Sequence, residues 1–304
     1  MPLDADTLIE RQRLRRRLTL WRILFVVAVA AAILAAVGRF AGTDAPGDHV
    51  ALLDVSGIIE TDTEREAALD ALAEDDSVKA LILRIDSPGG TFVGGESLAI
   101  ALQRVAEKKP VVTIMDDVAA SAGYMIATST DHIIARRGTI TGSIGVIFPT
   151  TSVVDFFEKL GVTFDAIKSD PLKANPSPFE ETLPAARAWT QTVVDQMKGV
   201  FVEMVAEGRP NLTQADVARL ADGRIYTGDQ ALANGLIDEI GGEREARAWL
   251  AANHEVPADL PVIEVTIDEE EWWLAAILGS GGKSLLPEPL TLDGLLALWQ
   301  PDGS

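Results

Sequence analysis

Short apolar strands alternate with amphipathic helices in the first part of this 304-residue chain. Val78–Ile85 is apolar at every position from Ala80 to Leu83, and Val111–Met115 is a short apolar, β-branched run, a pattern typical of strands buried on both faces. Between them, Glu96–Glu107 carries apolar residues at helical spacing, and Val50–Val55 followed by Thr63–Asp75 repeats the strand and helix upstream. Strand, helix, strand, helix, strand is the order of right-handed βαβ units, so the sequence predicts an α/β fold with a parallel sheet.

A serine stands where the last of these strands turns into a predicted helix. The stretch Val111–Ala127 is apolar up to Met115, is interrupted by acidic and small residues, and becomes helix-like from Ser121 onward. Ser121 then has two interpretations. It is either a helix N-cap, which serine commonly fills, or a nucleophile beside free helix N–H groups that face a developing oxyanion. Taken alone, this stretch favours the cap.

A Ser-Pro-Gly-Gly segment, Ser87–Gly90, follows the buried strand Val78–Ile85. Open α/β sheets usually keep their sites at the carboxyl ends of the strands. Proline fixes one backbone dihedral, and the two glycines let the backbone approach a bound chain closely. An ordinary tight turn explains the same residues equally well, so both interpretations stay open.

A serine nucleophile needs a base, and the candidates are few. The chain has no cysteine, which excludes a thiol nucleophile, a cysteine zinc site and disulfides. His49, His132 and His254 all lack a convincing triad setting. A lysine amine is a base only when it is uncharged, and apolar surroundings favour that form. Lys168 and Lys173 stand out because they flank a loop rich in proline and serine.

Hydroxyl side chains that suit such a lysine occur in Gly138–Phe148, a glycine-hydroxyl stretch predicted to run into an apolar strand. Thr141 and Ser143 could hydrogen-bond an amine without charging it. Val162–Ile167, just before the lysines, alternates like a further strand.

The second half of the chain is mostly helical by its spacing. Ala185–Glu207 predicts a long amphipathic helix whose apolar stripe suits core or subunit packing. Thr213–Ala221 and Glu243–Asn253 predict shorter helices, with Thr213 as an N-cap. Val262–Ile267 suits one more strand.

The N-terminal region predicts a membrane anchor. Ile23–Val37 contains fifteen apolar residues without a break, and the flanking arginines can snorkel, so residues 18–40 reach a workable length for a span. Residues 1–17 hold five arginines, which predicts a cytoplasmic tail and a translocated body. A cleaved signal peptide with its site at Ala36–Gly38 is the alternative. The long polar region before the apolar run favours the uncleaved anchor.

The remaining boundaries follow from composition. We expect a linker at residues 41–48, a folded domain at 49–253 and a C-terminal extension at 254–304. The net charge is −20, although residues 1–40 are basic, so the body is strongly acidic. Nucleic-acid binding needs basic patches and is therefore not expected.

Four separated motifs match one family in order and spacing: Asp86–Gly90, Ala120–Tyr124, Thr141–Val146 and Gly223–Asp238. With them, residues 48–250 resemble the signal peptide peptidase A-type serine proteases of peptidase family S49, in their short single-repeat form with an N-terminal anchor. The resemblance implies a crotonase/Clp-protease-like fold and makes residues 49–253 a serine protease domain.

The resemblance also implies a serine–lysine dyad and an oxyanion hole. The implied residues are Ser121 as nucleophile, Lys173 as base, Ser143 as the group that orients the lysine, and the N–H groups of Gly90 and Ala122 as oxyanion hole. Lys168 remains the competing base, because residues 169–172 depart from the family pattern. Ala122 stands where glycine is common, and alanine supplies the same backbone N–H.

The function that this resemblance implies is a membrane-anchored serine endopeptidase that cleaves membrane-associated peptides, such as remnant signal peptides. Its catalytic domain would lie on the periplasmic side of the inner membrane, in a homo-oligomer where one subunit's lysine completes a neighbour's serine. We expect no cofactor and no metal. Two alternatives stay open: a crotonase-like acyl-thioester enzyme and a non-catalytic membrane scaffold of the same fold.

Overall fold

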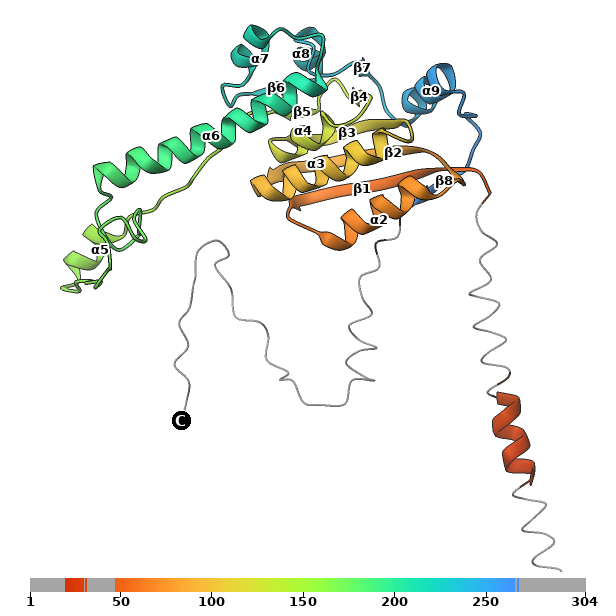
Figure 1. Cartoon of the computed structure of the whole chain (residues 1–304), viewed down its shortest axis with the longest axis horizontal. Helices are drawn as coiled ribbons and strands as arrows, with labels where there is room; N and C mark the ends of the chain where they lie inside the picture. Colours follow the sequence, from red (N-terminus) through yellow and green to blue (C-terminus); the bar gives the residue numbers. More distant parts are fainter. Residues whose placement is uncertain (1–19, 30, 32–46, 266, 268–304) are drawn as a thin grey trace, which may run out of the picture. The chain divides into compact units, whose positions relative to one another are not determined.

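The computed structural model describes residues 20–29, 31, 47–265 and 267. Its strands form an 8-stranded sheet with the order β6-β5-β3-β2-β1-β8, while β4 pairs with β3 and β7 pairs with β4 (Figure 1). The strands are β1 His49–Ile59, β2 Val78–Gly90, β3 Val111–Ala120, β4 His132–Ala135, β5 Ile140–Gly142, β6 Ile225–Thr227, β7 Glu239–Ile240 and β8 Val262–Glu264. The helices are α2 Thr63–Glu74, α3 Phe92–Ala106, α4 Ala122–Ala127, α5 Val154–Lys159, α6 Pro184–Gly208, α7 Gln214–Leu220, α8 Gly228–Ala233 and α9 Glu243–His254.

The central strands pair as the βαβ pattern predicts. β1, β2 and β3 are parallel neighbours joined through α2 and α3, and β8 adds to β1 in parallel. β5 and β6 form an antiparallel pair. The predicted α/β fold with a parallel central sheet is therefore confirmed.

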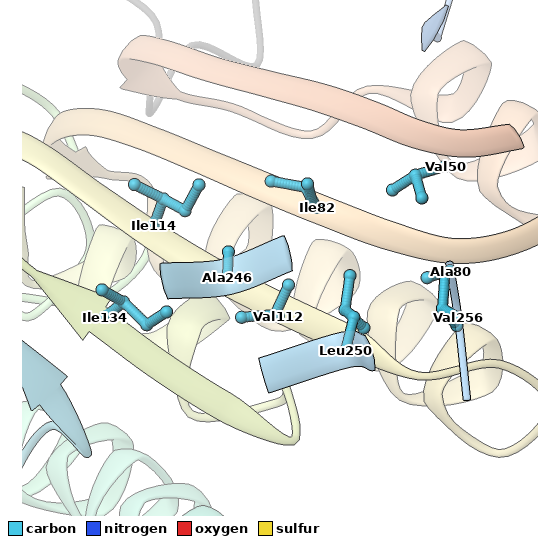
Figure 2. Packing of buried hydrophobic residues seen from close by; sticks show 9 residues of the cluster. All are labelled: Val50, Ala80, Ile82, Val112, Ile114, Ile134, Ala246, Leu250 and Val256. Atoms are coloured by element: carbon cyan, nitrogen blue, oxygen red, sulfur yellow. The ribbon is translucent and has the colours of Figure 1, made fainter. Parts of the chain in front are cut away.

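The central strands bury side chains on both faces, because successive residues of a strand point to opposite sides. Ile82 and Ile114 lie on the face that α9 covers, where they belong to one cluster with Leu250 (Figure 2). Ile85 points to the other face, where its side chain lies close to Gly123 of α4. This packing explains why the sequence is apolar at every position from Ala80 to Leu83.

Three local predictions are wrong. Ser87–Gly90 is not a tight turn but the end of β2, because Gly89 and Gly90 pair with Ile58 and Ile59 of β1. The expected strand at the end of Gly138–Phe148 stops at Gly142, and the following residues are irregular. Val162–Ile167 is irregular as well, since no strand pairs with it.

Helix α6 extends past the sheet, and α5 lies near the end of α6 that is farther from the sheet (Figure 1). We call residues 153–183, which include α5, the arm. The arm has its own small aromatic cluster, in which Phe157, Phe164 and Phe179 contact one another at ring-centroid distances of 4.7–6.3 Å. Several apolar side chains of the arm are exposed: the exposed fraction is 102% for Ile167 and 61% for Phe156.

About half of the predicted anchor, residues 20–29 and 31, falls in the described part of the chain. Residues 20–29 are helical. Among the described residues, no helix combines the length and the apolar character needed to cross a bilayer. The predicted tail at 1–17, the rest of the anchor at 18–40, most of the linker at 41–48 and the extension beyond residue 267 lie outside the described residues.

Candidate active site

A groove of about 700 Å³ opens where the end of β2, the start of α4 and the middle of α6 meet. Ser121 and Ser143 both line it, and we call it the Ser121 groove. Its walls are largely apolar and come from four parts of the chain: Phe92, Met125, Ile144, Val146, Ile147, Phe148, Val193, Val194, Met197 and Phe201. Such walls suit an extended peptide with small or apolar side chains.

Ser121 joins β3 to α4 in a strained backbone conformation. Its φ is 54° and its ψ is −120°, a region that favours glycine, and its side chain makes no capping hydrogen bond. Ser121 therefore occupies the N-cap position of α4, but its side chain does not cap the helix. The Ser121 N–H donates to the Gly142 carbonyl at 2.9 Å, which ties the turn to β5. Strain of this kind is typical of functional sites, and here it leaves the Ser121 hydroxyl free of a cap bond beside the groove.

The glycines of the Ser-Pro-Gly-Gly segment are required by close approach. Gly89 has a φ of +120°, and a Cβ atom placed on it would lie 2.8 Å from the Ser121 Cβ atom. A Cβ atom on Gly90 would lie 1.8 Å from the Ile59 carbonyl oxygen. Ser87 holds this segment to β1, since its hydroxyl donates to the Gly57 carbonyl at 2.6 Å. The segment brings the end of β2 against Ser121.

Gly90 and Ala122, the two residues expected to form an oxyanion hole, both line the Ser121 groove. Ala122 is the first residue of α4, so its N–H has no acceptor within the helix. That N–H lies directly after Ser121 in the chain. A backbone donor in this position suits the oxygen of a tetrahedral intermediate on the serine.

Ser143 and Thr141, the hydroxyl residues noted for the lysine, differ in availability. Ser143 lines the groove with a φ of 52°, and its N–H donates to the Arg224 carbonyl at 2.9 Å. Thr141 is fully buried, and its hydroxyl donates to the Ala119 carbonyl at 2.7 Å. Only Ser143 of this pair is therefore placed to meet a group in the groove.

Neither Lys173 nor Lys168 lines the Ser121 groove of its own chain. Both lie in the arm, beyond α5. The Lys168 ammonium donates to the Glu180 carboxylate at 2.7 Å, so it is held in an ion pair. Lys173 is exposed in a turn, where its backbone N–H donates to the Asp170 carbonyl. A single chain thus brings together Ser121, Ser143, Gly90 and Ala122, but not the lysines.

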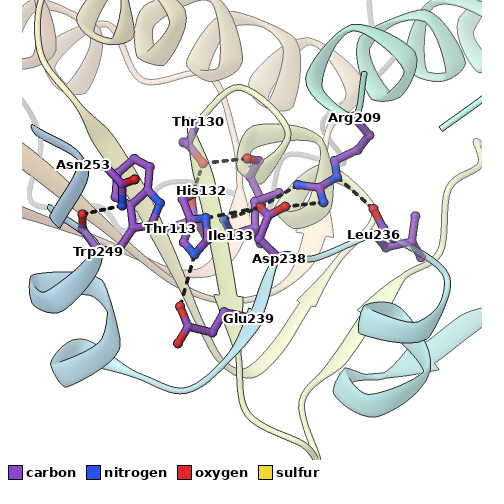
Figure 3. A network of polar contacts seen from close by, with 12 residues as sticks. Thr113, Thr130, His132, Ile133, Arg209, Leu236, Asp238, Glu239, Trp249 and Asn253 are labelled. Atoms are coloured by element: carbon purple, nitrogen blue, oxygen red, sulfur yellow. Dashed lines mark hydrogen bonds and ion pairs between the residues drawn. The ribbon is translucent and has the colours of Figure 1, made fainter. Parts of the chain in front are cut away.

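Figure 3 shows a network of polar contacts that includes Arg209, Asp238 and Ile133. The guanidinium of Arg209 donates to both oxygens of Asp238 at 2.7 and 2.6 Å, and Asp238 also accepts the Ile133 N–H at 2.9 Å. Burial opposes the ionisation of Asp238, but the hydrogen bonds and the positive charge of Arg209, together with the Ile133 N–H, outweigh it and hold the pKa of that carboxyl below its usual value. The buried Tyr124 hydroxyl donates to the Leu236 carbonyl at 2.9 Å, so the same loop holds α4.

One groove residue, Lys198, is not among the site residues predicted from the sequence. It lines the Ser121 groove from α6 and is half-buried. The signal was its spacing: Gln191, Val194, Lys198 and Phe201 follow one another at helical intervals on the face that lines the groove. A lysine that shares a helix face with apolar residues can place its positive charge at a binding surface.

Comparisons with known proteins agree with this geometry. The model of peptidase family S49 matches residues 103–257. The protein slr0021 of Synechocystis sp. is 44% identical over 66% of this chain and 73% of its own length. Serine protease SPPA, chloroplastic, of Arabidopsis thaliana is 31% identical over 74% of this chain and 33% of its own length.

A solved structure resembles the chain more distantly. It is a mutant of the 1510-N membrane-bound stomatin-specific protease in complex with a substrate peptide, with a TM-score of 0.48 and 17% identity over 77% of this chain and 99% of that one. Among the functions that the sequence leaves open, the family match and the relatives support the peptidase rather than the acyl-thioester enzyme or the scaffold. The chain belongs to peptidase family S49 and is a serine peptidase of the signal peptide peptidase A type.

Proposed function

We propose that the chain is a membrane-anchored serine endopeptidase that uses a Ser121–Lys173 dyad to cleave membrane-associated peptides, such as remnant signal peptides. The observation that carries this proposal is the strained, uncapped Ser121 beside a long, largely apolar groove. Apolar walls favour segments such as the hydrophobic core of a signal peptide, because burial of apolar surface drives their binding.

In the first step, the Ser121 Oγ attacks the scissile carbonyl carbon while its proton passes to the uncharged Nζ of Lys173. The N–H groups of Gly90 and Ala122 donate to the oxyanion that forms. The peptide C–N bond then breaks as the lysine returns the proton to the leaving amine. This step gives an acyl-enzyme ester on Ser121 and a free amine product.

In the second step, water attacks the ester carbonyl and gives a proton to the same lysine amine. Collapse of the second tetrahedral intermediate breaks the ester bond, and the proton returns to the Ser121 oxygen. The products are a carboxylic acid and the regenerated serine. Ser143, which lines the groove, would accept a hydrogen bond from the lysine and orient it without adding charge.

The lysine would come from a neighbouring subunit. Lys173 lies in the arm, outside the groove of its own chain, and the arm exposes apolar side chains such as Ile167 and Phe156. A surface of this kind is typical of a subunit contact. Lys168 is the weaker candidate for the base, because it already pairs with Glu180 and would have to leave that ion pair to reach a serine.

The anchor and the location follow from the N-terminal sequence. The apolar run Ile23–Val37 and the arginines of residues 1–17 support a single span with the catalytic domain outside the cytoplasm. That location is where signal peptides remain after secretion, so enzyme and substrate would share one membrane face.

The test is a peptidase assay on the purified full chain with an internally quenched, leucine-rich peptide, with Ser121→Ala measured beside it. The wild type should hydrolyse the peptide, and the variant should lose about 10⁴-fold in kcat/KM, as expected when a nucleophile is removed. A fluorophosphonate probe should label the wild type and not Ser121→Ala. Unchanged turnover or labelling in the variant would contradict the assignment.

A further inference from the structure

Lys198 is a cationic side chain in the Ser121 groove, whose walls are largely apolar. It lines the Ser121 groove and is half-buried on α6. Within the described part of the chain, its ammonium makes no ion pair and no side-chain hydrogen bond, including none to Ser121. A lysine in such a setting loses part of its hydration as a ligand fills the groove, and a neutral ligand supplies no negative charge to compensate for that loss.

The carboxylates that share the groove are already engaged. Asp195 accepts a hydrogen bond from the Gln191 side chain at 2.8 Å. Asp222 is held by Arg224, whose guanidinium Nε donates to it at 2.9 Å. The Arg224 side-chain hydrogen bond keeps the pKa of Asp222 below its usual value, so this carboxylate stays charged and paired. Neither acid forms an ion pair with Lys198 among the described residues.

We propose that Lys198 determines substrate specificity by binding a carboxylate of the peptide in the Ser121 groove. The carboxylate is either an Asp or Glu side chain at one subsite or the free C-terminus of the peptide, and both offer the same acceptor oxygens to the ammonium. This inference rests on the proposed function, because it takes a peptide as the occupant of the groove.

Lys198 thereby selects substrates in two ways. A peptide with a carboxylate at the right position gains a charge-assisted hydrogen bond in a site of reduced dielectric. A peptide without one buries the ammonium unpaired, which weakens its binding. Discrimination equals the difference between these two effects, so it exceeds what the new contact alone supplies.

The experiment moves one glutamate along an internally quenched Ala/Leu peptide and compares each peptide with its glutamine twin. Each peptide is made with a free C-terminal acid and with a C-terminal amide. The proteins are the full chain as wild type, Lys198→Met, Lys198→Glu and the control Lys79→Met. Lys79 lies on β2 outside the groove and pairs with Asp48 at 3.1 Å, so the control removes a charge without touching the site.

At one glutamate position, or for the free acid against the amide, wild type should show about a tenfold preference in kcat/KM for the carboxylate, the size expected for one charge-assisted hydrogen bond. Lys198→Met should reduce that ratio to about one, and Lys198→Glu should reverse it, so that the glutamine or amide peptide is cleaved faster than its charged twin. Neutral peptides should not lose kcat/KM with Lys198→Met, because the unpaired ammonium is gone, and all peptides should change by less than about twofold with Lys79→Met.

Binding of the same fluorescent peptides to Ser121→Ala, and to Ser121→Ala with Lys198→Met, separates this proposal from the peptidase mechanism. A carboxylate preference that disappears with Lys198→Met in the binding assay supports the subsite even if the wild type hydrolyses nothing. No carboxylate preference at any position overturns the proposal. An equal loss for charged and neutral peptides also overturns it, because Lys198 would then act in proton transfer or assembly.

Discussion

Gly89 and Ser121 are packed so closely that a Cβ atom on the glycine would lie 2.8 Å from the serine Cβ and 3.2 Å from its Oγ. The contact joins the end of β2 to the turn between β3 and α4, two segments that are 32 residues apart in the chain. Real Cβ atoms do not approach this closely, so only glycine leaves Ser121 its place. The position of the nucleophile is therefore fixed by the absence of a side chain on the neighbouring strand.

Gly89→Ala should damage the site more than the fold. The substitution forces a φ of +120° on alanine, at about 1–3 kcal/mol, and pushes on Ser121. We expect kcat to fall by about 100-fold, because small displacements of catalytic groups have effects of that size. Circular dichroism and kcat/KM measure the two consequences separately.

Gly57→Ala is the matched control for this substitution. Gly57 also has a positive φ, of 71°, but a Cβ atom there would meet nothing within 4 Å. It should lose about 1–2 kcal/mol of stability and keep its activity within about twofold. Equal activity losses in the two variants would show that backbone strain, and not the contact with Ser121, accounts for the effect.

Phe157→Ala should disrupt the arm while the sheet domain stays folded. Phe157 contacts Phe156, Phe164 and Phe179, and these rings form the arm's own cluster. Hydrogen exchange should become fast in residues 153–183 and stay slow in β1, β2 and β3, because local units open independently of the core. Peptidase activity should fall at least about tenfold, since Lys173 lies in this arm. Full activity in a variant whose arm exchanges its amide hydrogens rapidly would show that the arm takes no part in catalysis.

Asp238→Asn should destabilise the fold, because it leaves Arg209 buried without a counter-charge. About 3 kcal/mol of unfolding free energy should be lost near pH 7, the lower end for a buried pair since Asp238 is a quarter exposed. Asp229→Asn, which removes an exposed pair with Arg137, should cost less than about 1 kcal/mol. Urea denaturation of both variants gives the comparison.

The pH dependence of the same variant follows from the lowered pKa of Asp238. A depressed carboxyl pKa contributes stability that is complete above the unfolded value of about 3.9 and is lost as pH falls through the folded value. The stability difference between wild type and Asp238→Asn should therefore be constant between pH 6 and 8 and shrink below about pH 4. A difference that is unchanged at low pH would mean that the pair contributes no ionic stabilisation.

The core of the fold was predictable because it depends on local pattern. Ala80–Leu83 and Val111–Met115 place apolar or β-branched residues at successive positions, a pattern that indicates a strand buried on both faces. The extensions of these strands were not predictable in the same way. Val118 belongs to β3 because it pairs with Ile140, and its N–H donates to Asp86 at 3.1 Å. Such pairing is non-local and leaves no periodic signal.

The predicted strand at Val162–Ile167 is the reverse case, in which the pattern is present but the strand does not form. Its alternation is real, but no partner strand accepts it, and Phe164 packs on Phe157 and Phe179 instead. Sheet pairing is a tertiary property, which a β-like pattern permits but does not impose.

The candidate site was predictable only where a motif carried it. Ser121, Ser143, Gly90 and Ala122 were named from their motifs and line one groove. Lys198 was missed, because a single lysine on a helix looks solvated until the helix is placed against the groove. The base remains a prediction, since its partner serine would belong to another copy of the chain.

Mixing two inactive variants tests the shared dyad directly. Ser121→Ala and Lys173→Ala should each be inactive alone, because each lacks one half of every dyad. Subunits unfolded and refolded together in equal amounts should recover about a quarter of wild-type activity, since a random neighbour pair supplies an intact serine and an intact lysine that often. Recovery near that level is the result we predict. No recovery from mixed oligomers, or full activity of Lys173→Ala alone, would contradict a Ser121–Lys173 dyad formed between neighbours.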